Sequence, residues 1–247
     1  MLGEDEMYDI HCHILPGVDD GPSNIEKALE MAYSAEQVGI KVIVCTPHYI
    51  DDKYKNSSEN NRLTLNSFKK AIELSGIGIE IYLGNEVHIT PDIVKLLDLK
   101  SIITLNNSRY ILIEMPAHSK PLFTDDIIFK LKLRGLVPVI AHPERYEWVI
   151  KSPKELSNII SKGCLTQLNI ASINGYYGES VRKAAKTLVR ENYIHILGSD
   201  SHSSKIIYSK YHTDLKLLQK ISSEHLVKQM IQNTGAAIYN QVVKTFS

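Results

Sequence analysis

Two histidines separated by one residue form a pair that could bind a metal ion. His11 and His13 lie in a run that is typical of a β-strand, where alternate side chains leave the same face, so both imidazoles can approach one cation. A turn rich in Pro and Gly follows, and it carries the adjacent carboxylates Asp19 and Asp20. Imidazoles and carboxylates together suit Zn, Mn or Fe. Because a His-x-His pair alone also fits two structural histidines, further metal-competent residues must decide.

The elements that would position these residues are predicted by apolar runs that alternate with amphipathic stretches. Residues 41–46 form a short, nearly continuous apolar run, which is typical of a strand buried on both faces of a parallel sheet. Residues 24–38 carry apolar side chains at helical spacing and precede Gly39, which predicts a helix that ends there. In the last part of the chain, the pattern predicts helices over residues 210–220, 224–232 and 235–243.

This alternation also predicts the fold class. Seven predicted strands, each separated from the next by a helix, indicate right-handed βαβ units in an α/β protein. With parallel strands throughout, the economical closure is a barrel related to the eightfold (β/α) barrel. The sequence contains no linker long enough to divide it, so we expect one domain over residues 1–247, with residues 1–6 as a short extension.

The metal-competent side chains gather at the C-terminal ends of the predicted strands, where such folds place their chemistry. Six of the seven predicted strands end at such residues, and only the strand that ends near Asn169 does not. The residues at these ends are His11, His13, His48, Glu86, Glu114, His142, Asp200 and His202. Scattered surface residues would not follow strand ends in this way, so we interpret these residues, together with Asp20, as one site.

Nine potential ligands predict more than one metal ion, because roughly four to six donors saturate a common first-row ion. A carboxylate such as Glu86 or Glu114 can bridge two ions with its two oxygens. Ions held ~3.5–4 Å apart stabilise the attacking and leaving oxygens of an in-line displacement, and they lower the pKa of bound water. Two or three ions in such a site favour hydrolysis of a phosphate ester.

Cationic residues near the predicted site support a phosphorylated substrate. Arg145 follows the strand end at His142, and a guanidinium there can bind phosphoryl oxygens in a bidentate way. The alternative is a surface ion pair between Arg145 and Glu144 or Glu147. Lys205 is a second candidate contact for the phosphate.

Charge and cysteine content exclude other classes of protein. Lys+Arg and Asp+Glu both total 28, so no global positive field attracts nucleic acid or an anionic membrane. No segment approaches the ~20 continuous apolar residues of a membrane span, so we expect a cytoplasmic protein. Cys12, Cys45 and Cys164 lie within or at the end of apolar runs, which predicts reduced, buried thiols. None is followed six residues later by the arginine that a cysteine phosphatase loop needs.

Six ordered motifs resemble those of the polymerase-and-histidinol-phosphatase (PHP) superfamily. Within it, they resemble the bacterial protein-tyrosine-phosphatase branch of the CpsB/YwqE type, from capsule and exopolysaccharide loci. The motifs are IHCHILPGVDDGP at residues 10–22, TPH at 46–48, GNE at 84–86, NSRYILIE at 107–114, VIAHPERY at 139–146 and GSDSH at 198–202. The resemblance extends from about residue 7 to residue 245.

The resemblance implies a distorted, TIM-like (β/α)7 barrel with a trinuclear site that is often manganese-dependent, with Fe, Zn, Co or Mg as alternative ions. It also implies hydrolysis of phosphotyrosine on a cognate bacterial tyrosine kinase, which would regulate capsule or exopolysaccharide synthesis. The nine residues above become the metal ligands, although Asp19 could take the place of Asp20. His48 and Arg145 become catalytic residues, and Arg145 also binds the phosphate.

One departure from the family pattern concerns the second phosphate contact. Relatives often carry an arginine shortly after the final Asp-x-His, whereas the cationic residues in 203–210 are all lysines, which makes Lys205 the candidate substitute. Two other functions stay open: a histidinol-phosphate phosphatase, which would share the metals, and a metal-stabilised regulatory protein that binds the kinase without catalysis. The NSRYILIE and HPERY motifs favour the tyrosine branch, and the complete ligand set argues against the non-catalytic protein.

Overall fold

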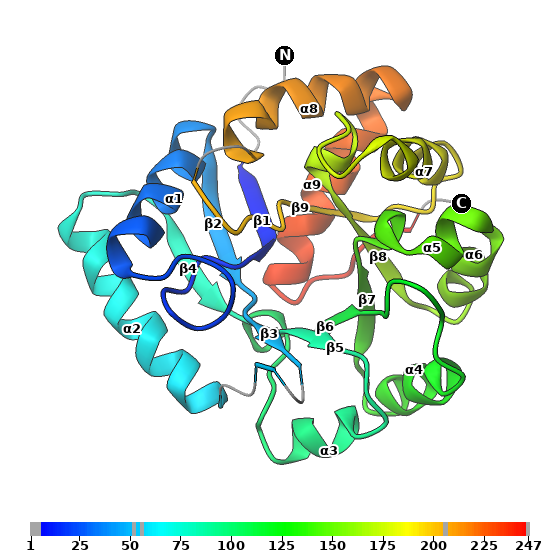
Figure 1. Cartoon of the computed structure of the whole chain (residues 1–247), viewed down its shortest axis with the longest axis horizontal. Helices are drawn as coiled ribbons and strands as arrows, with labels where there is room; N and C mark the ends of the chain where they lie inside the picture. The colour runs from blue at the N-terminus through cyan, green and yellow to red at the C-terminus, as the bar shows by residue number, and fades with distance from the viewer. Residues whose placement is uncertain (1–5, 51–52, 55–56, 205–206, 246–247) are drawn as a thin grey trace.

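The structure is a computed structural model, and it describes residues 6–50, 53–54, 57–204 and 207–245. Helices surround a central group of strands (Figure 1). The strands are β1 (Met7–Cys12), β2 (Ile40–Cys45), β3 (His48–Tyr49), β4 (Glu80–Leu83), β5 (Glu86–His88), β6 (Tyr110–Glu114), β7 (Val137–Ala141), β8 (Leu165–Asn169) and β9 (Ile196–Gly198). The helices are α1 (Ile25–Gln37), α2 (Ser58–Leu74), α3 (Ile93–Asp98), α4 (Thr124–Leu133), α5 (Glu147–Lys151), α6 (Lys154–Ile160), α7 (Glu179–Arg190), α8 (Ile207–Ile221) and α9 (Glu224–Ile238). Among the helices of these described ranges, none combines the length and the apolar character needed to cross a membrane.

The strands form two parallel sheets, which confirms the predicted α/β class. One sheet has the order β1-β2-β4, and the other has the order β3-β5-β6-β7-β8-β9. All of the strand pairs in both sheets are parallel. The end of β1 meets the segment after β9 through an isolated parallel bridge between Cys12 and Ser201. Because the described strands do not form one closed sheet, the predicted closed barrel is not confirmed.

Two of the seven predicted strands are each followed by a second, short strand, and this divides the pairing between two sheets. The strand predicted over residues 41–46 corresponds to β2, and the short strand β3 begins only after Pro47, whose nitrogen cannot donate to a neighbouring strand. In the same way, β4 ends just before Gly84, and the short strand β5 begins beyond it. A Cβ at Gly84 would lie 3.2 Å from the Cα of Leu105, so the backbones approach closely where the strand breaks.

Helix α1 shows how the local sequence sets the boundaries of an element. The side chain of Asn24 accepts a hydrogen bond from the backbone N–H of Lys27, which caps the first turn. The small residues Ala28, Ala32 and Ala35 are buried on one face of the helix, so it can pack closely against the sheet. The helix ends at Gln37, close to the end that Gly39 predicts.

The inner faces of the strands change from apolar to polar along the strand direction. Because successive strand residues point to opposite faces, Leu165, Gln167 and Asn169 of β8 share one face. Leu165 belongs to an apolar cluster, whereas the two amides reach the candidate site. That inner apolar cluster includes Ile10, Val42, Val44, Leu112, Val139, Leu165 and Ile196. The polar ends of the strands are therefore left to build the site.

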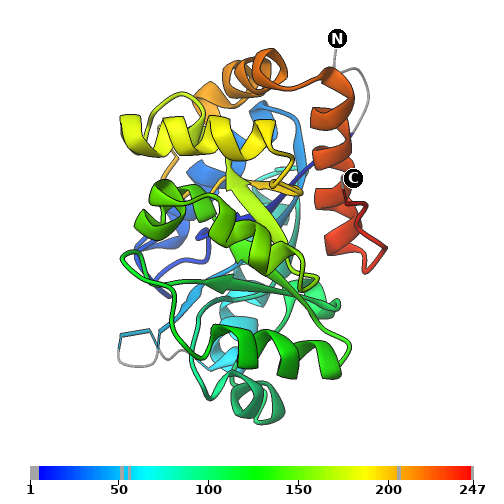
Figure 2. The ribbon, with the colours of Figure 1, turned by 90° about the vertical axis from the view of Figure 1, so that its right-hand side faces the viewer.

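Helix α9 lies on the side of the molecule opposite the face viewed in Figure 1, as the turned view in Figure 2 shows. The separate helices predicted over residues 224–232 and 235–243 are wrong, because α9 is one helix that runs through Gly235 and ends at Ile238. A Cβ at Gly235 would lie 2.7 Å from Cε2 of Tyr8. Glycine at this position therefore allows α9 to pack against Tyr8, and it does not end the helix.

Candidate metal centre

The turn after β1 folds back over the end of the strand and brings two carboxylates to the histidines. Gly21 allows this fold, because a Cβ at that position would lie 1.9 Å from the carbonyl oxygen of His13. His11 and His13 are both fully buried, and their Nε2 atoms lie 3.2 Å apart. Asp19 contacts His13 directly, and Asp20 lies near it in the same cluster.

The carboxylate of Glu86 lies at the centre of the cluster. Its Oε2 atom lies 3.0 Å from Nδ1 of His48, 3.2 Å from Nε2 of His13 and 3.3 Å from Nε2 of His11. Its Oε1 atom lies 2.9 Å from Nε2 of His142. Glu86 is fully buried, yet neither its Oε2 nor Nδ1 of His48 has a partner with hydrogen-bond geometry. Buried polar atoms without partners are rare, so this convergence fits side chains that ligate a cation.

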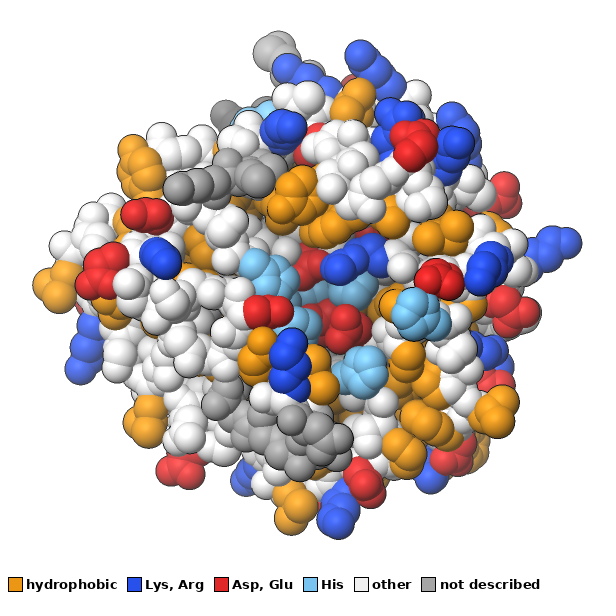
Figure 3. Space-filling model, in the orientation of Figure 1, with side chains coloured by type: hydrophobic (Ala, Val, Ile, Leu, Met, Phe, Trp, Pro, Cys, Tyr) orange, Lys and Arg blue, Asp and Glu red, His pale blue; other side chains and the backbone are white. Residues whose placement is uncertain are grey.

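The structure brings all nine predicted ligands into four overlapping groups, and within each group the candidate ligand atoms lie within 4.8 Å of one another. The groups are His13, Asp20, His48 and His202; His11, His142 and Asp200; His11, His13 and Glu86; and His48, Glu86 and Glu114. Shared members join the groups into one cluster, which offers enough donors for more than one ion. Figure 3 shows histidine and acidic side chains gathered in a hollow at the centre of this face.

The cluster also carries an excess of negative charge. Burial disfavours the protonated form of His11, but the charges of Glu86 and Asp200 outweigh this effect and raise its pKa to about 9. Oδ1 of Asp200 lies 3.5 Å from Nε2 of His11 and 3.4 Å from Nε2 of His13. A field that favours positive charge on a buried imidazole also favours a bound cation.

The two adjacent aspartates, which the sequence left as alternatives, occupy different places. Oδ2 of Asp19 lies 2.7 Å from Nδ1 of His13 and accepts the backbone N–H of His48, while Oδ1 accepts the backbone N–H of Gly21. Burial would raise the pKa of Asp19, but the hydrogen bond and charge of His13 lower it to about 2. Asp20 is 46% exposed, and its Oδ1 lies 3.2 Å from Nε2 of His202. This geometry favours Asp20 as the ligand and Asp19 as the residue that orients His13.

Strand β8 contributes two residues that were absent from the sequence prediction. Oε1 of Gln167 lies 2.8 Å from Nδ1 of His11, so Nδ1 carries a proton and Nε2 is the atom that faces the cluster. Nε2 of Gln167 donates to Oδ1 of Asn169, and Nδ2 of Asn169 donates to Oδ2 of Asp200. The alternation of 165, 167 and 169 on one face of a predicted strand was the available signal, but amides do not indicate metal binding.

Two predicted ligands lie within two residues of a strand end and have a left-handed backbone conformation. His142, after β7, has φ 31°, and Asp200, after β9, has φ 53°. Residues other than glycine adopt this conformation at a cost, and they often do so at functional sites. The backbone N–H of Asp200 donates to the carbonyl oxygen of His11 at 2.8 Å, which ties this turn to β1.

Arg145 points its guanidinium toward the cluster. It lies in the short 3-10 helix Pro143–Arg145, and its Nη1 donates to Oδ2 of Asp200 at 2.7 Å. Its guanidinium carbon lies 4.7 Å from the ring centroid of Tyr177. Glu144 instead accepts hydrogen bonds from Asn169 and Ser172, and Glu147 pairs with His118 and Lys151. The alternative ion pairs of Arg145 with Glu144 or Glu147 are therefore not formed.

His88 lies beside the site but is not one of the predicted ligands. Nδ1 of His88 lies 3.3 Å from Oε2 of Glu114, but His88 belongs to none of the four groups. Lys205, the predicted second phosphate contact, lies outside the described residues.

Comparison with known proteins places this chain in a family. The sequence model for capsular polysaccharide synthesis proteins of the CpsB/CapC type matches residues 7–240. The chain belongs to the CpsB/CapC family. It is 36% identical to the putative tyrosine-protein phosphatase CapC of Staphylococcus aureus, over 80% of this chain and 77% of CapC. It is 33% identical to the tyrosine-protein phosphatase YwqE of Bacillus subtilis, over 96% of this chain and 93% of YwqE.

The CpsB/CapC match extends to the structure. The fold superimposes with a TM-score of 0.93, at 32% identity and over 97% of both chains, on a chain from the crystal structures of YwqE from B. subtilis and CpsB from Streptococcus pneumoniae. Those two proteins are described as unique metal-dependent tyrosine phosphatases. The resemblance inferred from six motifs is confirmed, and all nine predicted ligands lie within the matched residues.

Proposed function

We propose that this protein is a metal-dependent protein-tyrosine-phosphatase that acts on phosphotyrosine of a cognate bacterial tyrosine kinase. The observation that carries the proposal is the convergence of nine metal-competent side chains around the buried carboxylate of Glu86, with the guanidinium of Arg145 beside them. The described activity of YwqE and CpsB supports it. By the same similarity we assign the protein to the regulation of capsule or exopolysaccharide synthesis, in the cytoplasm.

Two or three divalent ions would occupy the cluster, and we propose Mn²⁺ as the native ion. Imidazole and carboxylate donors also accept Fe, Zn, Co or Mg, so the metal content of the purified protein is a necessary measurement. When bound, such ions polarise phosphoryl oxygens and lower the pKa of bound water. We also interpret the two sheets as parts of one distorted (β/α)7 barrel, within a single domain.

The side chains around the ligands would prepare the site for a phosphate ester. Gln167 and Asp19 hold His11 and His13 with Nε2 facing Glu86. Asp200 and Tyr177 fix the guanidinium of Arg145, whose other N–H groups can bind phosphoryl oxygens. Tyrosine is a good leaving group, because its pKa of ~10 lies well below that of an alkyl alcohol. The site therefore has little need of a strong general acid.

The test is release of inorganic phosphate from a tyrosine-phosphorylated peptide and from histidinol phosphate, measured in parallel with Mn²⁺. His142→Ala removes a predicted ligand and should abolish turnover. His118→Ala is the matched control, because this histidine is 83% exposed and lies outside the four groups.

We expect fast release from the peptide that His142→Ala removes and His118→Ala preserves. Release from histidinol phosphate alone would keep the metal chemistry but reject the tyrosine substrate. No release from either substrate, with the metal sites filled, would favour the non-catalytic regulatory protein. Wild-type rates in His142→Ala at saturating Mn²⁺ would contradict the ligand assignment.

A further inference from the structure

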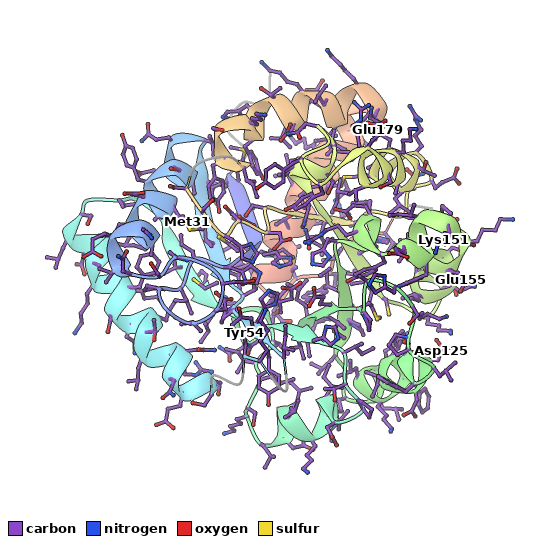
Figure 4. The ribbon with its side chains drawn as sticks, in the orientation of Figure 1. Met31, Tyr54, Asp125, Lys151, Glu155 and Glu179 are labelled. Atoms are coloured by element: carbon purple, nitrogen blue, oxygen red, sulfur yellow. The ribbon has the colours of Figure 1, made fainter. Side chains whose placement is uncertain are left out.

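A tyrosine and a lysine lie against His48 at the outer edge of the metal cluster. Two backbone hydrogen bonds, at 3.0 and 2.9 Å, join Tyr54 to Ile50, which directly follows β3. The Tyr54 ring is nearly parallel to the His48 imidazole, with an interplanar angle of 10° and 5.7 Å between ring centroids. Nζ of Lys53 lies 4.7 Å from the centroid of the Tyr54 ring. Figure 4 shows Tyr54 beside β3, near the centre of the face.

A second pair of this kind, Arg145 and Tyr177, also borders the cluster. Within the described ranges, a third cation–aromatic contact joins Lys69 of α2 to Tyr82 of β4. Tyr82 packs edge-on against Tyr239, beyond the end of α9, and is therefore remote from the metal ligands. Two of these contacts thus border the metal cluster, and the third provides a matched control.

The depth of the cluster determines which part of a substrate meets Tyr54. His11, His13 and Glu86 are fully buried. His48 lies at the edge of the cluster, where 11% of its side chain is exposed and its ring lies against Tyr54. A phosphate that reaches the buried ligands must have a spacer between it and the peptide backbone. Phosphotyrosine provides a phenyl ring as that spacer, whereas phosphoserine provides one methylene. The phenyl ring of a bound phosphotyrosine would therefore lie level with Tyr54.

We propose that Lys53 and Tyr54 form an aromatic lip that determines specificity for phosphotyrosine. This inference rests on the proposed phosphatase function and assigns its substrate recognition. Tyr54, whose ring already lies near His48 and Lys53, contacts the phenyl ring of the substrate. The ammonium of Lys53 attracts acidic residues that flank the phosphotyrosine. The lip acts on the substrate, and the metal ligands act on its phosphate.

The experiment compares kcat/KM for a phosphotyrosine peptide with kcat/KM for a phosphoserine peptide of the same sequence. In Tyr54→Ala we expect the ratio of the two values to fall roughly three- to tenfold, which is the effect of one aromatic contact. Tyr54→Phe keeps the ring and should keep the ratio. Tyr82→Ala removes a tyrosine from the remote pair, so its ratio should equal that of the wild type.

Lys53 is tested with peptides that carry either glutamate or glutamine beside the phosphotyrosine. In Lys53→Met we expect the preference for the acidic peptide to fall roughly two- to fivefold, as for a solvent-exposed ion pair, and to fall less at high salt. Lys69→Met removes the cation of the remote pair and should leave the preference unchanged.

Metal content per chain is measured for every variant, because Tyr54 also supports His48. An unchanged ratio in Tyr54→Ala would overturn the lip. An equal loss on both peptides, together with lost metal, would also overturn it and would make Tyr54 a residue that only positions His48. If the wild type does not hydrolyse the phosphotyrosine peptide, the proposed function fails first. If the wild type hydrolyses the phosphotyrosine peptide and Tyr54→Ala leaves the ratio of kcat/KM values unchanged, the lip is rejected while the proposed function stands.

Discussion

Replacement of Asp19 by asparagine should weaken metal binding without removing a ligand. The carboxylate contacts three donors: Nδ1 of His13 at 2.7 Å, and the backbone N–H groups of His48 and Gly21, each at 3.0 Å. An amide has one accepting oxygen where the carboxylate has two. In one orientation its NH₂ group faces the N–H of Gly21, and in the other it faces His13 and His48. Either orientation leaves at least one backbone N–H without an acceptor.

The magnitude follows from these contacts. One unsatisfied buried N–H should lower the free energy of unfolding by about 1–3 kcal/mol. Loss of the carboxylate that orients a metal-binding imidazole typically lowers metal affinity ~10–100-fold. We therefore expect the Mn²⁺ concentration for half-maximal activity of Asp19→Asn to rise by ~10–100-fold. The value of kcat at saturating Mn²⁺ should stay near that of the wild type, because every predicted ligand is still present.

The assay is a Mn²⁺ titration of phosphate release, combined with elemental analysis of metal per chain. Asp20→Asn is the control, because it removes a predicted ligand that is exposed at the edge of the cluster. Added Mn²⁺ should not restore the activity that Asp20→Asn loses. This variant should also bind fewer ions per chain than the wild type. The opposite pattern would refute our assignment of the two aspartates: activity of Asp20→Asn restored by metal, and activity of Asp19→Asn lost at every concentration.

Three further perturbations test other parts of the argument. Arg145→Ala should lower kcat/KM for the phosphotyrosine peptide by ~10²–10³-fold while metal content stays unchanged. Arg145→Lys should recover little of this activity. An unchanged kcat/KM in Arg145→Ala would reject the phosphate-binding role of Arg145. Burial raises the pKa of Asp214 to about 6, so its ionisation destabilises the fold as pH rises from about 4 through 6. In urea unfolding, the free energy of unfolding of Asp214→Asn should therefore increase by roughly 1–2 kcal/mol relative to that of the wild type between pH 5 and pH 8. A gain that does not depend on pH would contradict this cause. Gly235→Ala should lower the free energy of unfolding by about 1–3 kcal/mol through its clash with Tyr8, while kcat of the metal-loaded enzyme stays unchanged; wild-type stability would show that α9 can shift.

The convergence of the nine candidate ligands could be predicted because it depends on one general rule about parallel strands. Each strand delivers its last side chains to the same end of the fold, so residues as distant as His11 and Asp200 could be placed together from sequence alone. Helix boundaries could be predicted from sequence where a local capping signal exists, as at Asn24, the N-cap of α1.

The features that could not be predicted depend on contacts between distant residues. Gly235 has the appearance of a helix end, but its role is set by Tyr8, which lies more than two hundred positions earlier. The choice between Asp19 and Asp20 depends on how the turn folds over His13. Gln167 escaped notice because an amide binds metals poorly, and its contribution is to fix the tautomer of His11.

The left-handed conformations of His142 and Asp200 connect the fold to the chemistry. A strand that continued straight would carry these side chains past the cluster, whereas the turn at each residue directs them into it. Such conformations cost of order 1–3 kcal/mol each, and they persist where the surroundings fix them. Oε1 of Glu86 lies 2.9 Å from Nε2 of His142, while Arg145 and Asn169 both donate to Oδ2 of Asp200 and leave Oδ1 facing His11 and His13. Asp200 thus keeps the hydrogen bond from Asn169 when Arg145 is removed, and in our proposal the remaining N–H groups of Arg145 bind the phosphate.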